Sequence, residues 1–306
     1  MPLFRMPATR ALFALCCCVA LVGCAQAERA KASPREAPAT ASSYADRPEV
    51  RAFAAEVAAR STLDAAWIEA QLAQAQRQRT AQRLMMPAPA GTAKNWAAYR
   101  DRFIETQRVQ AGVQFWNDNQ ATLERAEAQY GVPAHVVVGI VGVETFYGRI
   151  TGTFRVLDVL ATLAFDFPSG RSDRSAFFRA ELEAYLLMCQ REGIEPTQLK
   201  GSYAGAMGLP QFMPSSLNRF AVDYDGDGHI DLQDNPSDVI GSVANYLAQH
   251  GWQRGMAPIY TVAAPSDIRQ RALLLVPDIL PTFTAEQFAQ MGAVLDDPGR
   301  VHNGLL

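Results

Sequence analysis

The sequence predicts a mainly α-helical protein with a small β component. From Pro48 onward, apolar residues recur at spacings of three and four, which is the period of one helix face. Segments rich in glycine and proline interrupt this pattern, and two short apolar segments near the C-terminus resemble strands. A chain of 306 residues is long enough to bury a core of ordinary size.

The first predicted helices lie before a break at residues 85–95, MMPAPAGTAKN. Their apolar positions are Val50, Phe53, Val57, Leu63, Trp67, Ile68 and Leu72. A second helical region runs from Trp96 towards Tyr130. Residues 131–133, Gly-Val-Pro, then open a helix that contains Glu144, because proline fits the first turn of a helix.

Further helices are predicted at residues 174–192 and 237–250, with a glycine-rich and an acidic segment between them. After Trp252, PIYTVAA (258–264) and RALLLVP (271–277) are the two strand candidates. A last helix is expected to begin at Thr284.

Residues 1–23 are predicted to be a secretory signal peptide. Arg5 and Arg10 precede an apolar run over residues 11–22, which is shorter than the roughly 20 residues needed to span a bilayer. The ending LVGC resembles a bacterial lipobox, which predicts cleavage before Cys24 and acylation of Cys24. An ordinary secretory signal with an incidental cysteine is the alternative.

The residue after Cys24 is Ala25 and not aspartate, which favours the periplasmic face of the outer membrane. Residues 24–45 are rich in alanine, proline and serine and lack apolar periodicity, so they are predicted to form a flexible tether. If Cys24 is acylated, Cys189 has no partner and the mature chain forms no internal disulfide. Without Arg5 and Arg10 there are 26 Lys and Arg against 31 Asp and Glu, and no basic block suggests nucleic acid as a partner.

Glu144 is the only charged residue between His135 and Arg149. A carboxyl group in an apolar wall loses hydration, which raises its pKa and lets it act as a general acid near neutral pH. The other interpretation is that Glu144 caps the helix or pairs with Arg149 at the surface. The segment alone does not decide between them.

The glycine-rich segment GSYAGAMGLPQFMPSS, residues 201–216, combines groups that suit a sugar ligand. Small residues such as Gly205 let the backbone approach a ligand closely. Ser202 and Gln211 supply hydrogen-bonding groups, and Met207 and Phe212 supply apolar faces. A turn that only connects two helices would have a similar composition.

The acidic segment DYDGDGHIDLQD, residues 223–234, resembles a calcium-binding loop of the EF-hand type. Asp223, Asp225 and Asp227 occupy positions one, three and five, and the backbone carbonyl of His229 occupies position seven. Position twelve is Asp234 instead of the usual glutamate, and a plain Asp/Gly turn is the alternative. Hard oxygen ligands suit Ca²⁺, whereas four scattered histidines give no zinc cluster.

Three segments together resemble the membrane-bound lytic murein transglycosylase B family. They are GIVGVETFYGR (139–149), the glycine-rich segment, and residues 223–252, DYDGDGHIDLQDNPSDVIGSVANYLAQHGW. The resemblance implies a lysozyme-like α core with an inserted EF-hand-like loop, flanking helices and a small β part. The implied domains are an N-terminal helical region at 46–109, a catalytic core at 110–254 with the loop at 223–238, and an incomplete C-terminal region at 255–306.

The resemblance also implies an activity, namely cleavage of the β-1,4 bond between N-acetylmuramic acid and N-acetylglucosamine in peptidoglycan, with 1,6-anhydromuramic acid ends. The catalytic acid would be Glu144, with Ser202 and Gln211 near it and Tyr246 as an aromatic residue of the saccharide groove. The closing calcium ligand would be Asp238 in PSDVIGS. A structural Ca²⁺ ion and no organic cofactor are expected.

Two other functions compete with this prediction. A muramidase would admit water and leave reducing ends. A peptidoglycan-binding lipoprotein would lack activity; this alternative arises because the sequence ends at VHNGLL, where relatives continue through a segment with a Tyr-Asn motif.

Overall fold

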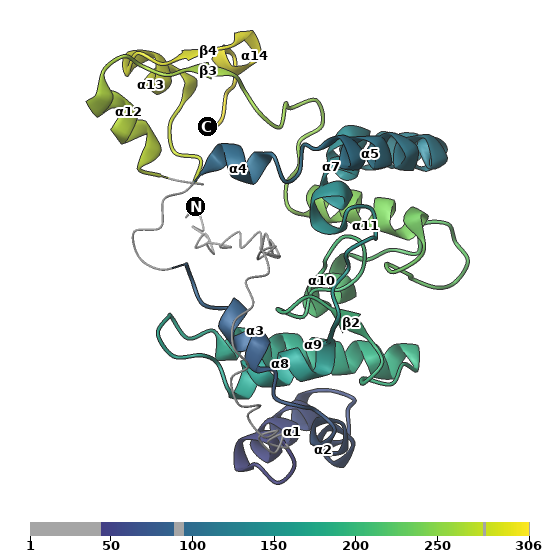
Figure 1. The fold of residues 1–306 in the computed structure, drawn as a ribbon. Coiled ribbons are helices and arrows are strands. Elements are labelled where there is room, and N and C mark those ends of the chain that lie inside the picture. The colour runs from purple at the N-terminus through teal and green to yellow at the C-terminus, as the bar shows by residue number, and fades with distance from the viewer. Residues whose placement is uncertain (1–43, 89–94, 278–279, 306) are drawn as a thin grey trace, which may run out of the picture. The chain divides into compact units, whose positions relative to one another are not determined.

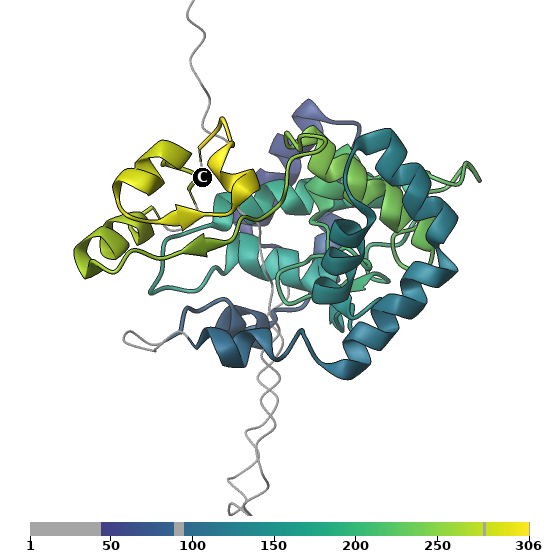
Figure 2. The same ribbon diagram turned by 90° about the horizontal axis from the view of Figure 1, so that it is seen from above.

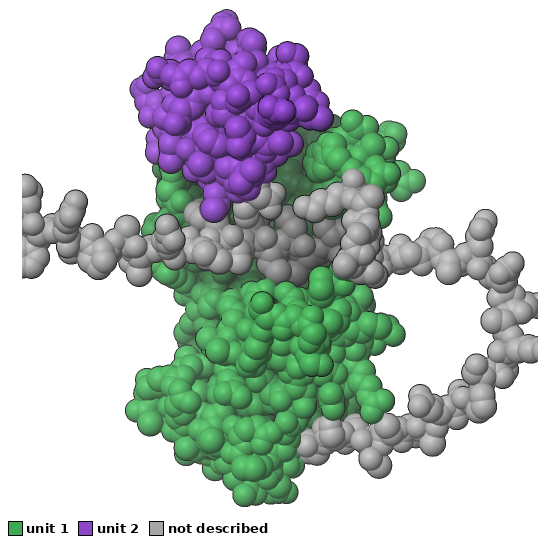
Figure 3. All heavy atoms as spheres, turned by 90° about the vertical axis from the view of Figure 1, so that its left-hand side faces the viewer, with its two compact units in different colours: residues 1–252 green, residues 253–306 purple. Residues whose placement is uncertain are grey.

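Helices dominate the computed structural model, which describes residues 44–88, 95–277 and 280–305 (Figure 1). The chain divides into two compact units, residues 1–252 and residues 253–306, coloured separately in Figure 3. In unit 1, two clusters of buried apolar side chains form the core. The predicted mainly helical fold class with a small β component is confirmed.

The first cluster surrounds a pair of long neighbouring helices, α8 and α9 (Figure 1). Their bounds are Val156–Phe165 and Ser175–Glu192. Residues 156–164 are all buried, so α8 runs through the middle of this cluster. The N-terminal helices add apolar side chains to it; they are α1 (Pro48–Arg60), α2 (Ala65–Ala73) and α3 (Arg79–Leu84).

The tether predicted for residues 24–45 is wrong at its C-terminal end. Tyr44 is completely buried in the first cluster, and its hydroxyl donates to the Asp166 carboxylate at 2.7 Å. Arg47 also donates to Asp166, at 2.9 Å. An aromatic ring with a buried hydroxyl partner is fixed and not flexible, so the folded part of the chain includes Tyr44. Cys24 and the predicted signal peptide, residues 1–23, lie outside the described residues.

The second cluster contains the candidate acid's helix, α7 (Ala134–Thr145), which packs against α5, α6 and α11. Their bounds are Thr106–Asp118, Gln120–Tyr130 and Pro236–Gln249. The short helix α4 (Trp96–Arg100) precedes α5. The long helical region predicted for 96–130 is therefore three helices. Pro133 is the N-cap residue of α7, one position earlier than a first-turn proline.

Two small elements connect the clusters. Strands β1 (Phe154–Arg155) and β2 (Lys200–Gly201) pair in antiparallel fashion, with Phe154 opposite Gly201. The helix α10 (Pro214–Phe220) follows the glycine-rich segment and packs on both α9 and α11. The segment between β2 and α10 contributes Met207 to the first cluster and Leu209 to the second, so it passes from one core to the other.

Unit 2 is built around the strands β3 (Val262–Ala263) and β4 (Val294–Leu295), which run antiparallel to each other (Figure 2). The helices α12 (Ile268–Leu275) and α13 (Ala285–Gln290) lie between them in sequence, and α14 (Asp297–Arg300) follows. Thr284 caps α13 through a capping box with Gln287, so the predicted helix start is confirmed.

The strand predicted at RALLLVP is wrong, because most of this segment belongs to α12. The Asp267 side chain accepts a hydrogen bond from the backbone N–H of Arg269 and starts the helix. A short apolar run has no periodicity that separates a helix from a strand, and leucine favours helix. The N-cap residue Asp267, which precedes the apolar run, therefore favours a helix over a strand here. In the other candidate, PIYTVAA, only Val262–Ala263 forms a strand.

Within residues 44–88, 95–277 and 280–305, no helix has the length and apolar character needed to cross a bilayer.

Candidate active site

The helix α7 ends in an unusual backbone conformation directly after Glu144 and Thr145. Phe146 and Tyr147 have φ of 53° and 56°, which is left-handed, and Gly148 follows with φ of 87°. For a residue with a side chain this conformation costs about 1–2 kcal/mol. Two such residues in succession need surrounding contacts that hold them, and such strain is frequent at functional sites.

Tyr147 is held between α5 and α7 by two glycines. Its hydroxyl oxygen would be 2.4 Å from a Cβ at Gly112 and equally 2.4 Å from a Cβ at Gly142. The ring lies 5.3 Å from the ring of Phe115. Burial raises the pKa of Tyr147, against a smaller opposing effect of Arg108. The absence of side chains at two helix positions therefore creates the slot that this ring fills.

Phe146 lies beneath two guanidinium groups. The Cζ atoms of Arg108 and Arg149 are each 4.5 Å from the centroid of its ring. Arg108 also donates from Nη1 to the carbonyl oxygen of Gly142 at 2.6 Å. A cation over an aromatic ring is attracted by the ring's quadrupole, so these contacts stabilise the first left-handed residue.

Thr145 ties the end of α7 to the glycine-rich segment. Its buried hydroxyl donates to the carbonyl oxygen of Leu209 at 2.8 Å and accepts from the backbone N–H of Gly148 at 3.1 Å. A second tie runs from Gln211 Nε2 to the carbonyl oxygen of Thr151 at 3.1 Å. The end of α7 and the residues just after it are therefore joined to the glycine-rich segment by two hydrogen bonds, one donated from each side.

Glu144 is the penultimate residue of α7 and has intermediate exposure. The residue is thus partly accessible and not fully enclosed in the core. Among its neighbours, Val143 is exposed and Thr145 is buried, so Glu144 lies at the border between the core and the surface. A general acid needs such a position, because it must reach a substrate oxygen.

In both Ser202 and Gln211, one polar atom of the side chain makes hydrogen bonds within the protein. Ser202 Oγ accepts from the backbone N–H groups of Ala204 and Ala206, at 3.3 and 3.1 Å, which leaves its hydroxyl hydrogen as the donor it could offer. Gln211 Nε2 donates to the carbonyl oxygens of Thr151 and Gly208, which leaves Oε1 as an acceptor. Gln211 also has a left-handed backbone, with φ of 52°.

The apolar residues of the glycine-rich segment are mostly core residues. Met207 is only 1% exposed, and its backbone pairs with that of Phe212 in an antiparallel bridge. The prediction that the Met207 side chain gives an apolar face to a ligand is corrected, because that side chain is enclosed in the first cluster. Gly205 is also buried and has φ of 87°, and a Cβ at this position would lie 2.6 Å from Leu160 Cδ2.

Phe212 and Tyr246 lie side by side, with ring centroids 5.2 Å apart. Phe212 is buried, whereas Tyr246 is partly exposed and also stacks on His250 at 4.1 Å. Burial raises the pKa of Tyr246. Of these two aromatic residues, Tyr246 is the one with accessible surface for a sugar ring.

The acidic segment at residues 223–234, called the acidic loop below, brings three predicted calcium ligands together. Carboxylate oxygens of Asp223, Asp225 and Asp227 lie within 4.8 Å of one another, and all three residues are exposed. Asp223 accepts from the N–H groups of Gly226 and Gly228, and Asp227 accepts from that of His229. Three converging carboxylates fit a hard divalent cation such as Ca²⁺. The role of the His229 carbonyl stays a prediction.

Asp238 lies outside this cluster of three carboxylates. It is fully buried, and its two oxygens accept from the backbone N–H groups of Tyr224 at 2.7 Å and Asp231 at 2.8 Å. Burial raises the pKa of Asp238; these two hydrogen bonds lower it, and the charges of Asp225 and Asp223 raise it further. Asp238 therefore closes the two ends of the loop through the backbone, and its role as a ligand stays a prediction.

The acidic loop is also linked to the glycine-rich segment. The backbone N–H of Leu209 donates to the carbonyl oxygen of Leu232 at 2.8 Å. At Gly208, a Cβ would be 2.5 Å from the same carbonyl oxygen, so only glycine allows this approach. The acidic loop thus packs on the segment that carries Ser202 and Gln211.

The sequence reasoning missed three residues that shape the site: Arg108, Thr145 and Tyr147. Thr145 and Tyr147 stand within the motif that contains Glu144, so their proximity in sequence was a usable signal. The contact of Arg108 with Gly142 spans 34 positions and has no local signature.

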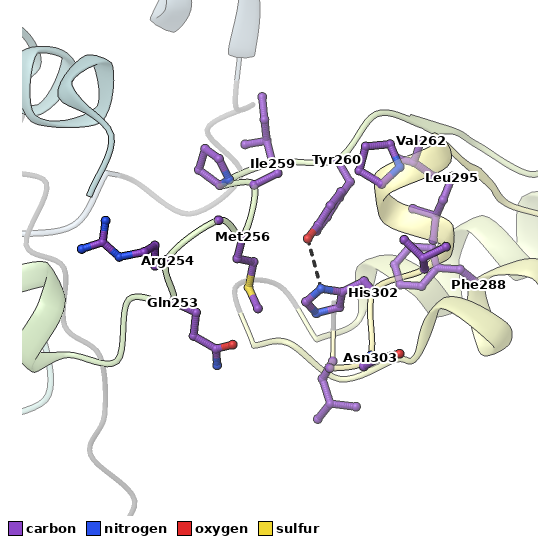
Figure 4. Close-up of a pocket in the computed structure, with 17 residues that line it drawn as sticks. Gln253, Arg254, Met256, Ile259, Tyr260, Val262, Phe288, Leu295, His302 and Asn303 are labelled. Atoms are coloured by element: carbon purple, nitrogen blue, oxygen red, sulfur yellow. Dashed lines mark hydrogen bonds between the residues drawn. The ribbon is translucent and has the colours of Figure 1, made fainter. Parts of the chain in front are cut away.

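A separate cavity of about 1230 Å³ lies within unit 2. The Tyr260 hydroxyl and His302 Nδ1 form a hydrogen bond of 3.0 Å beside it (Figure 4). Its other lining residues are mixed: Met256, Ile259 and Phe288 are apolar, and Gln253, Arg254 and Asn303 are polar. None of the site residues predicted from the sequence lines this cavity.

The mainly helical fold that carries Glu144 at the end of α7 is of the lysozyme-like class. Residues 45–300 match the family described as Transglycosylase SLT domain, and the chain belongs to that family. The resemblance to the membrane-bound lytic murein transglycosylase B family is thereby confirmed.

One relative by sequence is the membrane-bound lytic murein transglycosylase B of Escherichia coli K12. It is 45% identical over 220 residues, which cover 69% of this chain and 60% of that protein. The chain therefore spans about 60% of the length of this curated relative.

Solved structures of similar proteins cover more of both chains. The soluble lytic transglycosylase SltB1 of Pseudomonas aeruginosa is 41% identical with a TM-score of 0.75, over 82% of each chain. The E. coli lytic transglycosylase SLT35 in complex with calcium is 38% identical with a TM-score of 0.70, over 85% of this chain and 78% of that one. A structure of SLT35 in complex with bulgecin A has a TM-score of 0.72 at 38% identity, over 85% of this chain and 79% of that one.

Proposed function

We propose that this protein is a lytic transglycosylase that cleaves the β-1,4 bond between N-acetylmuramic acid and N-acetylglucosamine in peptidoglycan. The observation that carries the proposal is the position of Glu144 at the strained end of α7, next to Thr145, which is tied to the glycine-rich segment at Leu209. Rigid attachment of an acid beside a segment with polar groups is the arrangement that proton transfer to a bound sugar requires.

In this mechanism Glu144 performs both proton transfers. The protonated carboxyl group first gives its proton to the glycosidic oxygen, and the bond from that oxygen to C1 of the muramyl residue breaks. The resulting carboxylate then takes the proton of the muramyl C6 hydroxyl as O6 forms a bond to C1. The products are a 1,6-anhydromuramyl end and a free hydroxyl on N-acetylglucosamine, and Glu144 is protonated again.

A single acid suffices because the substrate supplies the nucleophile. Most glycoside hydrolases need a second carboxylate, which acts as a nucleophile or activates water. Here Ser202 and Gln211 would orient the sugar, through the hydroxyl hydrogen of the first and the amide oxygen of the second. The exposed part of Tyr246 would lie against a sugar ring face.

The test replaces Glu144 with glutamine, which is nearly isosteric and cannot transfer the proton. Glu144→Gln should reduce product release from murein sacculi by at least about 100-fold, which is the usual contribution of general acid–base catalysis. The matched control is Glu124→Gln, an exposed glutamate of α6, which should keep parental activity. Activity retained by Glu144→Gln would assign the chemistry to another group.

Mass spectrometry of the products separates the two enzymatic possibilities. Anhydro ends support the transglycosylase, and reducing ends would identify a muramidase that admits water. If the parent protein binds sacculi and releases no fragments, a binding lipoprotein is the correct function.

The proposal includes a structural calcium ion at Asp223, Asp225 and Asp227, with the His229 carbonyl and Asp238 as further ligands. The converging carboxylates support it. The loop is linked to the glycine-rich segment through Leu232 and Leu209, so the ion would stabilise the site's surroundings and take no part in bond cleavage.

We also propose that the protein is held at the periplasmic face of the outer membrane by acylation of Cys24. The lipobox-like sequence before Cys24 supports this anchor, and peptidoglycan glycan strands would be the partner within reach.

A further inference from the structure

Arg108 of α5 contacts the end of α7 in two places. Its Nη1 donates to the carbonyl oxygen of Gly142 at 2.6 Å, and its Cζ lies 4.5 Å from the centroid of the Phe146 ring. These two residues stand two positions before and two positions after Glu144 in the sequence. Arg108 therefore holds the chain on both sides of the candidate acid.

Arg108 brings a positive charge to the last turn of α7, where the helix carries a partial negative charge. The carbonyl oxygen of Gly142 also accepts from the backbone N–H of Phe146 at 3.2 Å, so it belongs to the last turn, where the helix carries a partial negative charge. A guanidinium group complements this charge. Its second contact, with the ring of Phe146, stabilises the residue at which the helix turns into the left-handed conformation.

Arg108 has a buried Nε atom that makes no hydrogen bond in the described part of the chain. Burying a donor without a partner is unfavourable. The arginine thus keeps its position through its contacts with Gly142 and Phe146, although this donor makes no hydrogen bond within the described residues.

We propose that Arg108 is a positioning residue for Glu144, which acts through Phe146 and Gly142 to fix the carboxyl group relative to the glycosidic bond. The inference deepens the proposed function and rests on it. Arg149 lies over the same ring, but it is an exposed residue. Among the described contacts, its side chain has no hydrogen bond to α7 like the one from Arg108 to Gly142. Arg108 is therefore the residue that links ring and helix.

A matched control exists at the end of α8. Arg179 donates from Nε to the carbonyl oxygen of Ala164 at 3.2 Å and lies over the Phe165 ring at 5.7 Å. It makes the same two kinds of contact at a helix end that carries none of the predicted site residues. Arg179→Ala thus measures what the loss of such contacts does to folding alone.

The kinetic test compares Arg108→Ala, Arg108→Lys, Arg179→Ala and Glu144→Gln on soluble glycan chains prepared from murein. Arg108→Ala should lower kcat by about tenfold or more and change KM by less than about twofold, because a small displacement of a reacting group is costly. Arg108→Lys should recover only part of the rate, since an ammonium group lacks the planar face that lies over the ring. Arg179→Ala should stay within about twofold of the parent.

The effects of Arg108→Ala and Phe146→Leu on kcat should not add, because both changes remove the same contact between the Arg108 guanidinium and the Phe146 ring. In hydrogen exchange, the peptide that covers residues 144–150 should exchange faster in Arg108→Ala than in the parent or in Arg179→Ala. This second measurement does not depend on activity.

The outcomes separate the inference from the proposed function. If Glu144→Gln is active, the proposed function fails. If Glu144→Gln is inactive while Arg108→Ala and Arg179→Ala have equal kcat values, the positioning role fails alone. Unchanged exchange at 144–150, or additive effects of Arg108→Ala and Phe146→Leu, would also overturn it.

Discussion

The end of α7 and the acidic loop are both irregular segments, but different forces hold them. At the end of α7, Phe146 and Tyr147 adopt left-handed conformations that large side chains rarely adopt, and buried contacts hold them there. In the acidic loop the left-handed residues Gly226 and Gly228 have open space around them, and exposed carboxylates accept backbone N–H groups.

The two regions should therefore respond to different changes: the end of α7 to changes in side-chain volume, and the acidic loop to cations. The position of Glu144 depends on packing, which a change in volume disturbs and an ion in solution does not. In the acidic loop, by contrast, three exposed carboxylates repel one another, and a bound cation would offset that repulsion. The comparison teaches that the proposed catalytic group is fixed by the fold, whereas the loop would be stabilised by the proposed calcium ion.

The largest effect is expected when the slot for Tyr147 is filled. In Gly142→Ala, the new Cβ would lie 2.4 Å from the Tyr147 hydroxyl oxygen and 2.7 Å from its Cζ. Such overpacking should reduce the free energy of unfolding by about 2–3 kcal/mol and displace the residues after Glu144. Urea denaturation and kcat would be measured together.

Gly139 of the same helix is the control, since a Cβ there has nothing within 4 Å. Gly139→Ala should raise the free energy of unfolding by about 0.5–1 kcal/mol, because alanine favours helix over glycine. If the two alanine variants behave alike, the end of α7 is not held by packing and the comparison breaks.

The next effect concerns the ion. The melting temperature of the parent should rise by roughly 5 °C from excess chelator to saturating calcium, because a ligand of the native state stabilises it by mass action. Asp225→Ala with Asp227→Ala should lose this response. Asp101→Ala with Asp118→Ala removes the same charge from exposed positions elsewhere and should keep it. A parent melting temperature that is equal in calcium and in chelator excludes the site.

The same contrast explains how far the sequence predicted the fold. Helices α9 and α11 were predicted to within about one residue of their observed ends, and in α9 buried positions recur along one face while the other face is exposed. The helix α8 was missed, since nine successive residues are buried and leave no periodicity to detect. Tyr44 was assigned to the tether because its partner Asp166 is 122 positions away.

The candidate site divides in a similar way. The acidic loop was predicted because its ligands follow each other at alternate positions, and the structure brings Asp223, Asp225 and Asp227 together. Glu144 was singled out as one charge in an apolar segment. The contacts that hold it come from α5 and from the glycine-rich segment, and side chains that meet only after folding leave no pattern in the local sequence.

The smallest effect tests whether the two regions are independent. Thr145→Val keeps the shape of the side chain but removes the hydroxyl that bonds the Leu209 carbonyl and the Gly148 N–H. Losing these bonds should cost about 1–2 kcal/mol, whereas Thr145→Ser, which keeps the hydroxyl, should cost less. The Leu209 N–H donates to Leu232 at the acidic loop, so Leu209 is hydrogen-bonded to both regions. Because packing and ion binding are separate forces, calcium should raise the melting temperatures of Thr145→Val and of the parent by equal increments. A smaller increment in Thr145→Val would show that Leu209 couples the loop to the end of α7.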